Sequence, residues 1–300
     1  MNGRDLFMGL VVVVIWGLNF IAIKVGLQDM PPLLLGTLRF LVATLPAIFF
    51  LPRPPIAWRW LLALGLALNV GQFAFLFMGM KLGMSAGLAS LLLQSQAFFT
   101  LAVAVAVLRE RWFWHHIAGL VTAAGGMAVI GLQQGGNVTV IGFGLVLLAA
   151  CSWGIGNVIL RRATRDIPPF SMLALVVWAG AVAIIPLAIL SLCVEGATAW
   201  VDALRSLNST TVGSLVYLAY FATLCGYALW GKLLAKYPAA AVSPLALLVP
   251  VVGISSSALL LGEVLSGSQV IGALLVMLGL VIHVFGGRLT RPADVLLNEK

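Results

Sequence analysis

Charged side chains are scarce in this sequence. Asp, Glu, Lys and Arg make up 9% of its 300 residues, against roughly 25% in an ordinary soluble domain, and 62% of the residues are hydrophobic. A soluble chain of this length cannot bury so much apolar surface. A bilayer with a hydrocarbon core of roughly 30 Å accepts apolar helices of about 20 residues, because their backbone groups all bond internally. The lack of charge therefore excludes a soluble protein and predicts an all-α integral membrane protein.

Acidic side chains are missing from the middle of the apolar runs, since all nine Asp and Glu residues lie near the ends of these runs or between them. A proton-driven pump usually needs a titratable group buried along its pathway. Proton coupling therefore has no support in the sequence. A pathway lined by amide and aromatic side chains suits a neutral or zwitterionic solute instead.

Patterns that signal catalysis or a bound cofactor are also lacking. The three cysteines lie in apolar runs without CxxC spacing, which favours small hydrophobic side chains over disulfides or metal ligands. The segment 226–232 fits the first seven positions of a P-loop, but Leu233 replaces the required Ser or Thr. The segment 83–87 fits a serine-hydrolase elbow, yet the three histidines are expected near the opposite membrane face. We predict no enzyme activity, no catalytic residue, no metal and no cofactor.

Apolar runs of about 20 residues, separated by Pro, Gly and charged residues, predict ten transmembrane helices. The first run is longer than the core of a signal peptide and is expected to be a retained helix. The longest connection, 195–210, has apolar residues at helical spacing, which predicts a short helix in the membrane interface. The approximate ranges of the ten spans are 6–26, 32–52, 59–79, 86–107, 114–132, 141–162, 171–194, 210–232, 241–261 and 268–286.

The positions of the Lys and Arg residues predict the orientation of these spans, because excess positive charge stays in the cytoplasm. With both termini cytoplasmic, thirteen of the seventeen basic residues fall on that side and three on the other. Only Arg39 is left inside a span. This split explains the net charge of +8 without invoking nucleic acid as a partner. The cytoplasmic set is Arg4, Arg53, Arg59, Arg109, Arg111, Arg161, Arg162, Arg165, Lys232, Lys236, Arg288, Arg291 and Lys300, and the opposite set is Lys24, Lys81 and Arg205.

The chain also repeats itself. A shift of 137 residues aligns Trp16-Gly17 with Trp153-Gly154, and a shift of 153 residues aligns Glu110 with Glu263. Two similar halves of five spans each must enter the membrane from opposite sides, because five is odd. The sequence therefore predicts two inverted five-helix repeats, with a substrate site near the membrane midplane between them. We assign residues 1–136 to the first repeat, 137–290 to the second, and 291–300 to a cytoplasmic tail.

Polar and aromatic side chains inside the spans are the candidate binding residues, because a buried polar group needs a partner or a water-filled cavity. Amides can equally join neighbouring helices, and aromatic stripes can be simple packing, so both alternatives stay open. Gln94 and Gln96 lie about 200° apart on a regular helix, so at most one is expected to point into a cavity. The candidate substrate-binding residues are Trp16, Asn19, Arg39, Asn69, Gln72, Gln94, Gln96, Trp153, Asn157, Tyr220, Tyr227, Trp230 and Pro250.

Two of these candidates act through special chemistry. Arg39 is a permanent charge inside a span, and it either attracts a substrate carboxylate or snorkels outward and pins helices together. The second role is the one that we expect. Pro244 and Pro250 interrupt the ninth span and free backbone carbonyls, which either line a pathway or follow from a simple kink.

Ten spans in two halves, each half opening with Trp-Gly and carrying a Glu after its fourth span, resemble the EamA family of the drug/metabolite transporter (DMT) superfamily. The local likeness is to bacterial exporters of O-acetylserine and cysteine in that family. It implies an inner-membrane exporter of such metabolites or related amino acids, and within the matching runs it points to Trp16, Asn19, Arg39, Gln72, Gln94 and Gln96. Those runs are VVVVIWGLNFIAIKVGL (11–27), LRF (38–40), QFAFLF (72–77), GLASLLLQSQAFFT (87–100) and PLALLVPVVG (244–253).

Other functions stay open beside cysteine-pathway export by alternating access. They are broader efflux of drugs or other metabolites by the same fold, a membrane-embedded enzyme, and a scaffold that transports nothing. The expected partners are a small-molecule substrate and the lipid bilayer of a bacterial cytoplasmic membrane. Small residues such as Gly119, Gly126, Gly272 and Gly279 allow close helix contacts within the chain or between copies, so a monomer and a homodimer are both open.

Overall fold

The computed structural model describes residues 1–132, 138–165 and 167–289. Helices dominate this part of the chain, which contains no β-strand. Nine helical segments of at least 18 residues are apolar enough to cross a membrane, and Pro32–Ile48 is a shorter apolar helix of 17 residues, about 25 Å long. These ten segments match the ten predicted spans, so the predicted fold class is confirmed. The predicted repeat boundary at 136/137 and the tail 291–300 lie outside the described residues.

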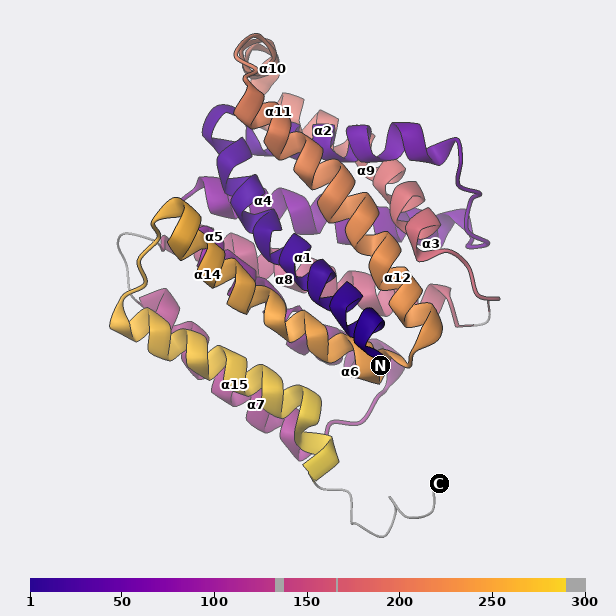
Figure 1. The fold of residues 1–300 in the computed structure, drawn as a ribbon, viewed down its shortest axis with the longest axis vertical. Helices are drawn as coiled ribbons and strands as arrows, with labels where there is room; N and C mark the ends of the chain where they lie inside the picture. Colours follow the sequence, from indigo (N-terminus) through magenta and orange to yellow (C-terminus); the bar gives the residue numbers. More distant parts are fainter. Residues whose placement is uncertain (133–137, 166, 290–300) are drawn as a thin grey trace.

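The helices follow one another along the chain with short connections (Figure 1). Several spans consist of consecutive pieces, because π-helical or 3₁₀ segments, here labelled η, interrupt the α-helix. The elements are α1 (Gly3–Asp29), α2 (Pro32–Ile48), α3 (Trp58–Leu64), η1 (Gly65–Gly71), α4 (Gln72–Lys81), α5 (Ala86–Leu92), η2 (Leu93–Ser95), α6 (Gln96–Leu108), α7 (Trp114–Leu132), α8 (Val140–Ala163), α9 (Met172–Val194), α10 (Gly196–Arg205), α11 (Ser209–Val216), η3 (Tyr217–Cys225), α12 (Gly226–Lys236), α13 (Ala239–Val242), η4 (Ser243–Leu248), α14 (Val249–Leu261) and α15 (Gly267–Leu289).

The irregular segments recur at equivalent places in the two halves. A shift of 153 residues moves the π-helical segment η1 from 65–71 to 218–224, inside the π-helical segment η3. The same shift moves the 3₁₀ segment η2 from 93–95 to 246–248, inside the 3₁₀ segment η4. The third and fourth spans of the first half and their counterparts in the second half therefore depart from regular helix geometry at equivalent positions.

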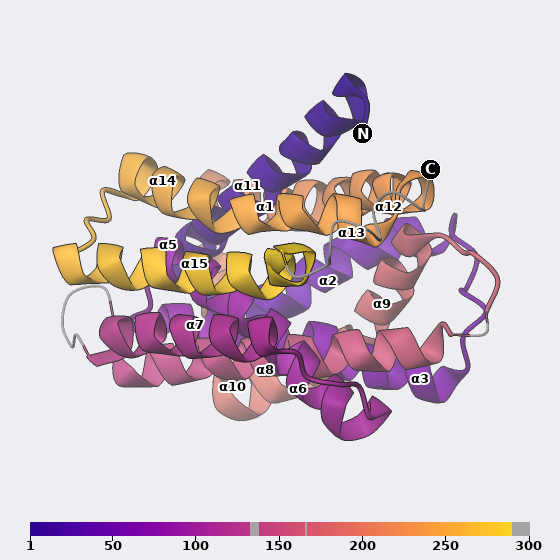
Figure 2. The same ribbon diagram turned by 90° about the horizontal axis from the view of Figure 1, so that it is seen from below.

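Helices α7 and α15 form a pair along one side of the bundle, and both views place them there (Figures 1 and 2). Glycines let their backbones meet. A Cβ atom added to Gly126 would lie 2.5 Å from the carbonyl oxygen of Gly272, and one added to Gly119 would lie 2.6 Å from that of Gly279. The small residues singled out in the sequence thus contact each other within the chain.

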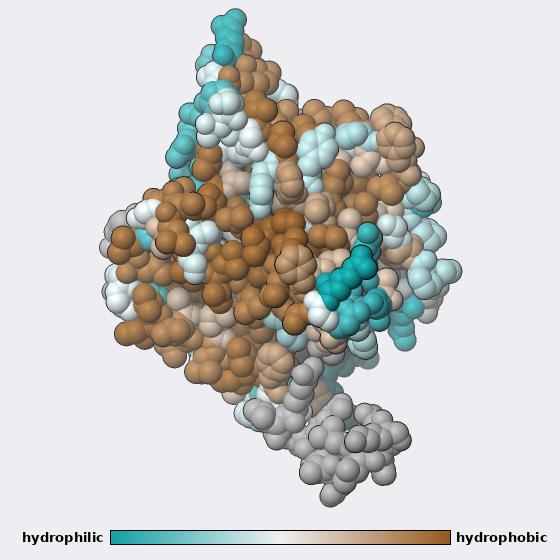
Figure 3. Space-filling view, viewed as in Figure 1, coloured by the Kyte–Doolittle hydropathy of each residue, from teal (hydrophilic) through white to brown (hydrophobic). Residues whose placement is uncertain are grey.

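Hydrophobic side chains cover much of the outer surface of the bundle (Figure 3). Phe50 and Leu259, for example, each expose 84% of their surface, as side chains facing lipid do. Hydrophilic residues gather on α10 and near the N-terminus, at opposite ends of the helices. We call these the α10 end and the N-terminal end of the bundle. The short helix predicted between residues 195 and 210 is confirmed as α10.

Candidate binding cavity

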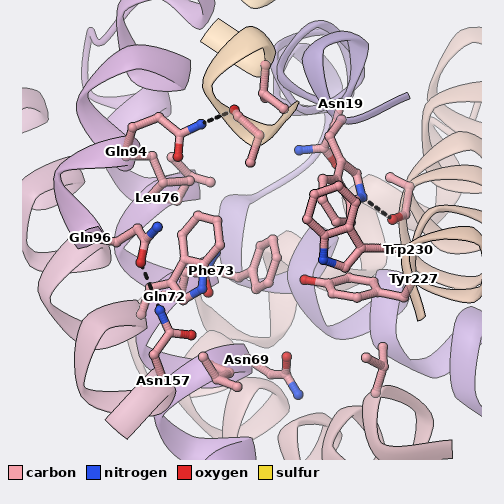
Figure 4. A pocket seen from close by; sticks show the side chains of 18 of the residues that line it. Asn19, Asn69, Gln72, Phe73, Leu76, Gln94, Gln96, Asn157, Tyr227 and Trp230 are labelled. Atoms are coloured by element: carbon pink, nitrogen blue, oxygen red, sulfur yellow. Dashed lines mark hydrogen bonds between the residues drawn. The ribbon is translucent and has the colours of Figure 1, made fainter. Parts of the chain in front are cut away.

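A cavity of about 450 Å³ lies in the middle of the bundle, within the usual size range of small-molecule sites, roughly 300–1,000 Å³. Both halves of the chain contribute to its wall, from every span except the fifth, α7. Eleven of the thirteen candidate residues line this cavity, and Figure 4 shows several of them converging on it. The eleven are Trp16, Asn19, Arg39, Asn69, Gln72, Gln94, Gln96, Trp153, Asn157, Tyr227 and Trp230.

Tyr220 is one of the two candidates that lie elsewhere. On an α-helix, the spacing of Tyr220, Thr223, Tyr227 and Trp230 would place them in one stripe, but Tyr220 does not line the cavity and is 41% exposed. The expected stripe assumed an α-helix. Tyr220 lies in the π-helical segment η3, whose i→i+5 bonding adds a residue to the turn and changes which side chains share a face. The placement of Tyr220 in the cavity wall was therefore wrong.

The two glutamines of the fourth span also depart from regular helix geometry. Gln94 and Gln96 both line the cavity, so the expectation that at most one of them faces it was wrong. Gln94 lies in the 3₁₀ segment η2, and Gln96 begins α6 directly after it. A 3₁₀ turn has three residues instead of 3.6, so the angle computed for a continuous α-helix does not apply across this junction.

Pro250 is the second candidate outside the cavity wall, yet it shapes the wall indirectly. It is buried at the start of α14 and is not a lining residue. Because proline has no N–H, it cannot donate to the carbonyl four residues earlier, which is that of Ala246. The Gln94 side-chain amide donates to this carbonyl oxygen at 2.9 Å instead (Figure 4). Ala246 lines the cavity, so the freed carbonyl anchors a polar side chain there.

Asn157 and Asn19, which the shift of 137 residues places one position apart, differ in their hydrogen bonding. Asn157 donates from Nδ2 to the Gln96 Oε1 atom at 2.8 Å and to the Thr100 hydroxyl at 3.1 Å, which joins α8 to α6. Asn19 is 8% exposed, and its Oδ1 atom is buried without a hydrogen-bond partner. The amide of the second half therefore joins helices, whereas that of the first half leaves an acceptor free beside the cavity.

Arg39 is 3% exposed and is the only charged residue among those that line the cavity. Its Nε and Nη2 atoms donate to the Thr223 hydroxyl at 3.3 and 3.2 Å, and its guanidinium lies 4.2 Å from the centre of the Phe73 ring. Its Nη1 atom is buried without a hydrogen-bond partner. Arg39 thus connects α2 to η3, as the pinning alternative predicted, but it does not snorkel to the surface.

An aromatic cluster forms the wall of the cavity next to Asn19. The Trp16 ring lies 5.3 Å from the Tyr227 ring and 5.2 Å from the Trp230 ring, measured between ring centres. The Trp16 indole N–H donates to the backbone carbonyl of Ala222 at 3.1 Å, which fixes the ring against η3. Figure 4 shows Asn19 on the same side of the cavity as Trp230 and Tyr227.

Sequence reasoning missed three parts of this site. Phe73, which stacks under Arg39, follows Asn69 by four residues, and that helical spacing could have pointed to it. Thr223, four residues before the candidate Tyr227, was not chosen as a candidate, although it is the partner of Arg39. The Ala246 carbonyl carries no side-chain signal in the sequence, because its role depends on Pro250 and Gln94 meeting in space.

The α10 end of the cavity is closed by packing and by polar contacts. Helices α5 and α14 pack along each other there, and the Glu263 carboxylate accepts from the Ala86 and Gly87 backbone amides at 2.9 and 3.1 Å. On the same end, the Lys81 ammonium donates to the Leu27 carbonyl at 2.6 Å, and the Asp29 carboxylate accepts from the Asn208 amide at 2.9 Å.

Toward the N-terminal end the cavity continues between the halves. Its wall there includes Leu160 near the end of α8, Met172 at the start of α9 and Val284 near the end of α15. Among the described residues, α6 and α13 do not pack together as α5 and α14 do. The structure is therefore closed at the α10 end, while its cavity extends toward the N-terminal end.

Among the described residues, no three His, Cys, Asp or Glu side chains lie close enough together to hold a metal ion. The three cysteines are free thiols: Cys193 is exposed, and Cys151 and Cys225 are half-buried. The polar groups of the residues that line the cavity are amides, hydroxyls, indole N–H groups, backbone groups and one guanidinium.

Comparison with known proteins identifies relatives of this chain. The profile of the EamA-like transporter family matches twice, at residues 4–132 and 140–285. A protein of Salmonella typhimurium named "Probable amino-acid metabolite efflux pump" is 48% identical over 98% of this chain and 99% of its own, and one of the same name from Escherichia coli is 44% identical over the same shares. A "Probable terminal-alkyne amino-acid exporter" of Streptantibioticus cattleyicolor is 30% identical over 90% of each chain. A crystal structure with 18% sequence identity has the same fold, with a TM-score of 0.66 over 98% of this chain and 100% of the other.

Proposed function

This chain belongs to the EamA-like transporter family and is a multi-pass membrane transporter rather than an enzyme, and on that premise we propose that it exports small zwitterionic amino-acid metabolites from the cytoplasm. O-acetylserine, cysteine and related amino acids are the proposed substrates. The relatives named as amino-acid metabolite efflux pumps support this substrate class, because they align with nearly the whole chain.

One observation carries the proposal: a cavity of about 450 Å³ that is enclosed by both halves of the chain and lined by six amide side chains and a guanidinium. Water is absent from the bilayer core, so polar groups at this depth are costly unless they serve a solute or a water-filled path. Gln96 and Asn157 bond to each other, and Gln94 bonds to the Ala246 carbonyl. The six amides are Asn19, Asn69, Gln72, Gln94, Gln96 and Asn157.

The proposed mechanism is alternating access, in which the two halves rock about the central cavity. The split of basic residues supports an orientation with both termini in the cytoplasm of a bacterial cell and the α10 end outside. In that orientation the structure is closed outward, with its cavity extending toward the cytoplasm. An exporter loads its substrate in this form.

Flux into proteoliposomes tests the proposal. Purified protein should move radiolabelled O-acetyl-L-serine and L-cysteine faster than protein-free vesicles do, and a proton gradient applied in a parallel sample shows whether transport is coupled to protons. Absence of flux for every amino-acid metabolite tested, with the protein folded in the vesicles, would overturn the proposal.

Broader efflux of drugs or other metabolites is the second candidate. It is favoured by one wall of the cavity, where α9 contributes the apolar side chains of Leu175, Val176 and Ala179. Such a wall binds apolar groups with little selectivity. Competition by a panel of apolar cations and amino acids in the same vesicles separates the two candidates, since only broad efflux predicts strong competition by compounds without an amino-acid group.

A further inference from the structure

We propose that the cavity binds its substrate through both ends of a zwitterion, the carboxylate at Arg39 and the ammonium at Asn19. This inference rests on the proposed function and specifies its substrate: an amino acid with a free α-carboxylate and a free α-ammonium group. It starts from the two polar atoms that the cavity wall leaves without a partner.

The two free atoms have opposite character. Arg39 Nη1 is a charged donor, and Asn19 Oδ1 is an acceptor, and both are buried without a hydrogen bond. Buried polar atoms in proteins are bonded in the great majority of cases, and exceptions call for an explanation. A zwitterion supplies what each lacks, because its carboxylate accepts and its ammonium donates.

The charge of the cavity points the same way. No Asp, Glu, Lys or His is among its lining residues, so the positive charge of Arg39 has no counter-ion there. An unpaired charge in a low-dielectric site is costly, and the substrate carboxylate is the natural anion to compensate it. Thr223 and Phe73 hold the guanidinium in place, so it is already oriented before the substrate enters.

The cavity wall also supplies aromatic rings for the ammonium group of the zwitterion. Thr223, the partner of Arg39, precedes Tyr227 by four residues, and Tyr227 belongs to the aromatic cluster beside Asn19. Aromatic faces attract ammonium groups through cation–π interaction. A substrate ammonium at Asn19 would therefore meet both a free carbonyl oxygen and the rings of Trp16 and Trp230.

Competition in the proteoliposome assay tests this assignment. The competitors are L-cysteine itself, its methyl ester, which lacks the carboxylate charge, and its N-acetyl derivative, which lacks the ammonium group. In the unmodified protein each derivative should compete about ten- to a hundredfold more weakly than L-cysteine, as expected for loss of one charged hydrogen bond. R39Q should raise the KM for L-cysteine by a similar factor. It should abolish the preference for L-cysteine over the methyl ester and keep the preference over the N-acetyl derivative. N19L should abolish the preference over the N-acetyl derivative only.

Two further variants separate binding from structural support. R39K keeps the charge and should restore part of the preference over the methyl ester. T223V removes the hydrogen bonds that connect α2 to η3 but leaves the guanidinium, so the preference over the methyl ester should survive. If R39Q and T223V behave alike, or if R39Q transports L-cysteine with an unchanged KM, Arg39 only joins helices. Failure of the unmodified protein to transport any amino acid would instead defeat the proposed function itself.

The second inference concerns Glu263 and its repeat mate Glu110, and a separate observation carries it. The fourth span ends at Arg109 with φ +56°, and the ninth ends at the repeat-equivalent Gly262 with φ +66°. Both residues adopt the left-handed backbone conformation, and each is followed by a glutamate. The left-handed form is unfavourable for Arg109, so the same turn is kept in both halves despite its cost.

The two glutamates nevertheless make different contacts. Glu263 bonds the first amides of the fourth span, at Ala86 and Gly87, and so ties the α10 end shut. The equivalent target of Glu110 is the start of the ninth span at Ala239, since 86 and 239 differ by 153. That helix start has no side-chain cap, and Glu110 forms an ion pair with Arg161 instead.

We infer that the two glutamates are alternating latches. In the form described here, Glu263 closes the outer end and Arg161 holds Glu110 away. In the opposite form, Glu263 releases Ala86 and Gly87, while Glu110 leaves Arg161 and caps the start of the ninth span, which closes the inner end. The inverted repeat makes this exchange geometrically equivalent in the two directions.

Cysteine accessibility tests the latches without any substrate, so its outcome is independent of the transport proposal. A single cysteine replaces Ala97, a cavity residue, in a chain whose three native cysteines are changed to serine. Labelling by a membrane-impermeant maleimide is compared between intact cells and inside-out vesicles. Loss of a helix cap should change the ratio of outer to inner labelling by about two- to thirtyfold.

The directions of the shifts identify the latches. E263A should raise outer labelling, and E110A should lower it. R161A should raise outer labelling by freeing Glu110, and adding E110A to R161A should cancel that rise. E195A is the matched control: Glu195 caps the Leu33 and Leu34 amides at the same end, but it joins α9 to α2, which pack together along their length.

E195A should leave the labelling ratio unchanged. The latch would be refuted if E263A and E110A changed the labelling ratio in the same direction. It would also be refuted if R161A still raised outer labelling when combined with E110A. If E263A does not accumulate in the membrane, E263Q keeps the shape of the side chain and replaces it in the same comparison.

Discussion

Replacement of Gly253 by alanine should force the outer end of the transporter open. Gly253 lies on α14 where it crosses α5, and a Cβ atom added there would be 2.4 Å from the Ser90 hydroxyl oxygen and 2.7 Å from the Ser90 Cβ. Ser90 is 1% exposed, and its hydroxyl donates to the Gly87 carbonyl at 2.6 Å, so moving it aside would break that hydrogen bond. The closed packing of α5 against α14 therefore requires glycine at position 253.

The size of the effect follows from the cost of overpacking, about 1–3 kcal/mol for an inserted methyl group in a tight interface. The cost applies to the form in which α5 and α14 are in contact, and opening relieves it. Because about 1.4 kcal/mol corresponds to a tenfold change in an equilibrium, G253A should raise the ratio of outward-open to outward-closed protein by about 5- to 150-fold.

Maleimide labelling of a cysteine at Ala97, compared between intact cells and inside-out vesicles, measures this ratio. G213A is the matched control, because a Cβ atom at Gly213 would meet nothing within 4 Å. S90G combined with G253A should return labelling toward that of the unmodified protein, since it removes the clashing side chain. If G253A labels like G213A, or if S90G does not correct it, the glycine contact does not control opening.

Two further changes test the packing of the bundle by thermal unfolding in detergent. N157L removes the hydrogen bonds to Gln96 and Thr100 and should lower the free energy of unfolding by about 1 kcal/mol or less. Hydrogen bonds between membrane helices average about 0.6 kcal/mol. A much larger loss would mean that the contact of Asn157 with Gln96 and Thr100 supports the fold. G126L should cost about 1–3 kcal/mol or more because its side chain would meet the backbone of α15, whereas G125L, at a position with nothing within 4 Å, should leave stability unchanged.

The spans and the repeat could be predicted from the sequence because both depend on properties summed over many residues. Hydropathy over about 20 residues found all ten segments, although it ended the second one about four residues too late, at 52 instead of Ile48. The residues of the cavity wall were mostly predictable for a related reason. A polar side chain inside an apolar run has few places to go, so eleven of thirteen candidates lie where a cavity could use them.

The errors have one physical origin, the irregular helix segments. Tyr220 and the Gln94–Gln96 pair were placed by the rotation of a regular α-helix, and both lie in or next to segments that break it. The residues of η3 do not by themselves indicate a π-helix, and the contacts that η3 makes with α1 and α2 join segments far apart in the sequence. Pro250 shows the complementary limit: the sequence identifies the carbonyl that it frees, but only the fold brings Gln94 to it.

The differences between repeat mates follow from the fact that one conformation cannot treat two inverted halves alike. When one end of the bundle is closed and the cavity extends to the other, equivalent residues face opposite conditions. Glu263 is bonded to a helix start, whereas Glu110 is not. For Glu110 and Glu263, exchanging the two environments converts the described form into its outward-open counterpart. Asn157 is paired and Asn19 keeps a free acceptor for a different reason. The partners of Asn157, Thr100 and Gln96, have Gly253 and Val249 as their counterparts in the second half, and neither of these has a side chain that can bond to Asn19. The latches can therefore alternate, while the substrate site stays asymmetric in both forms.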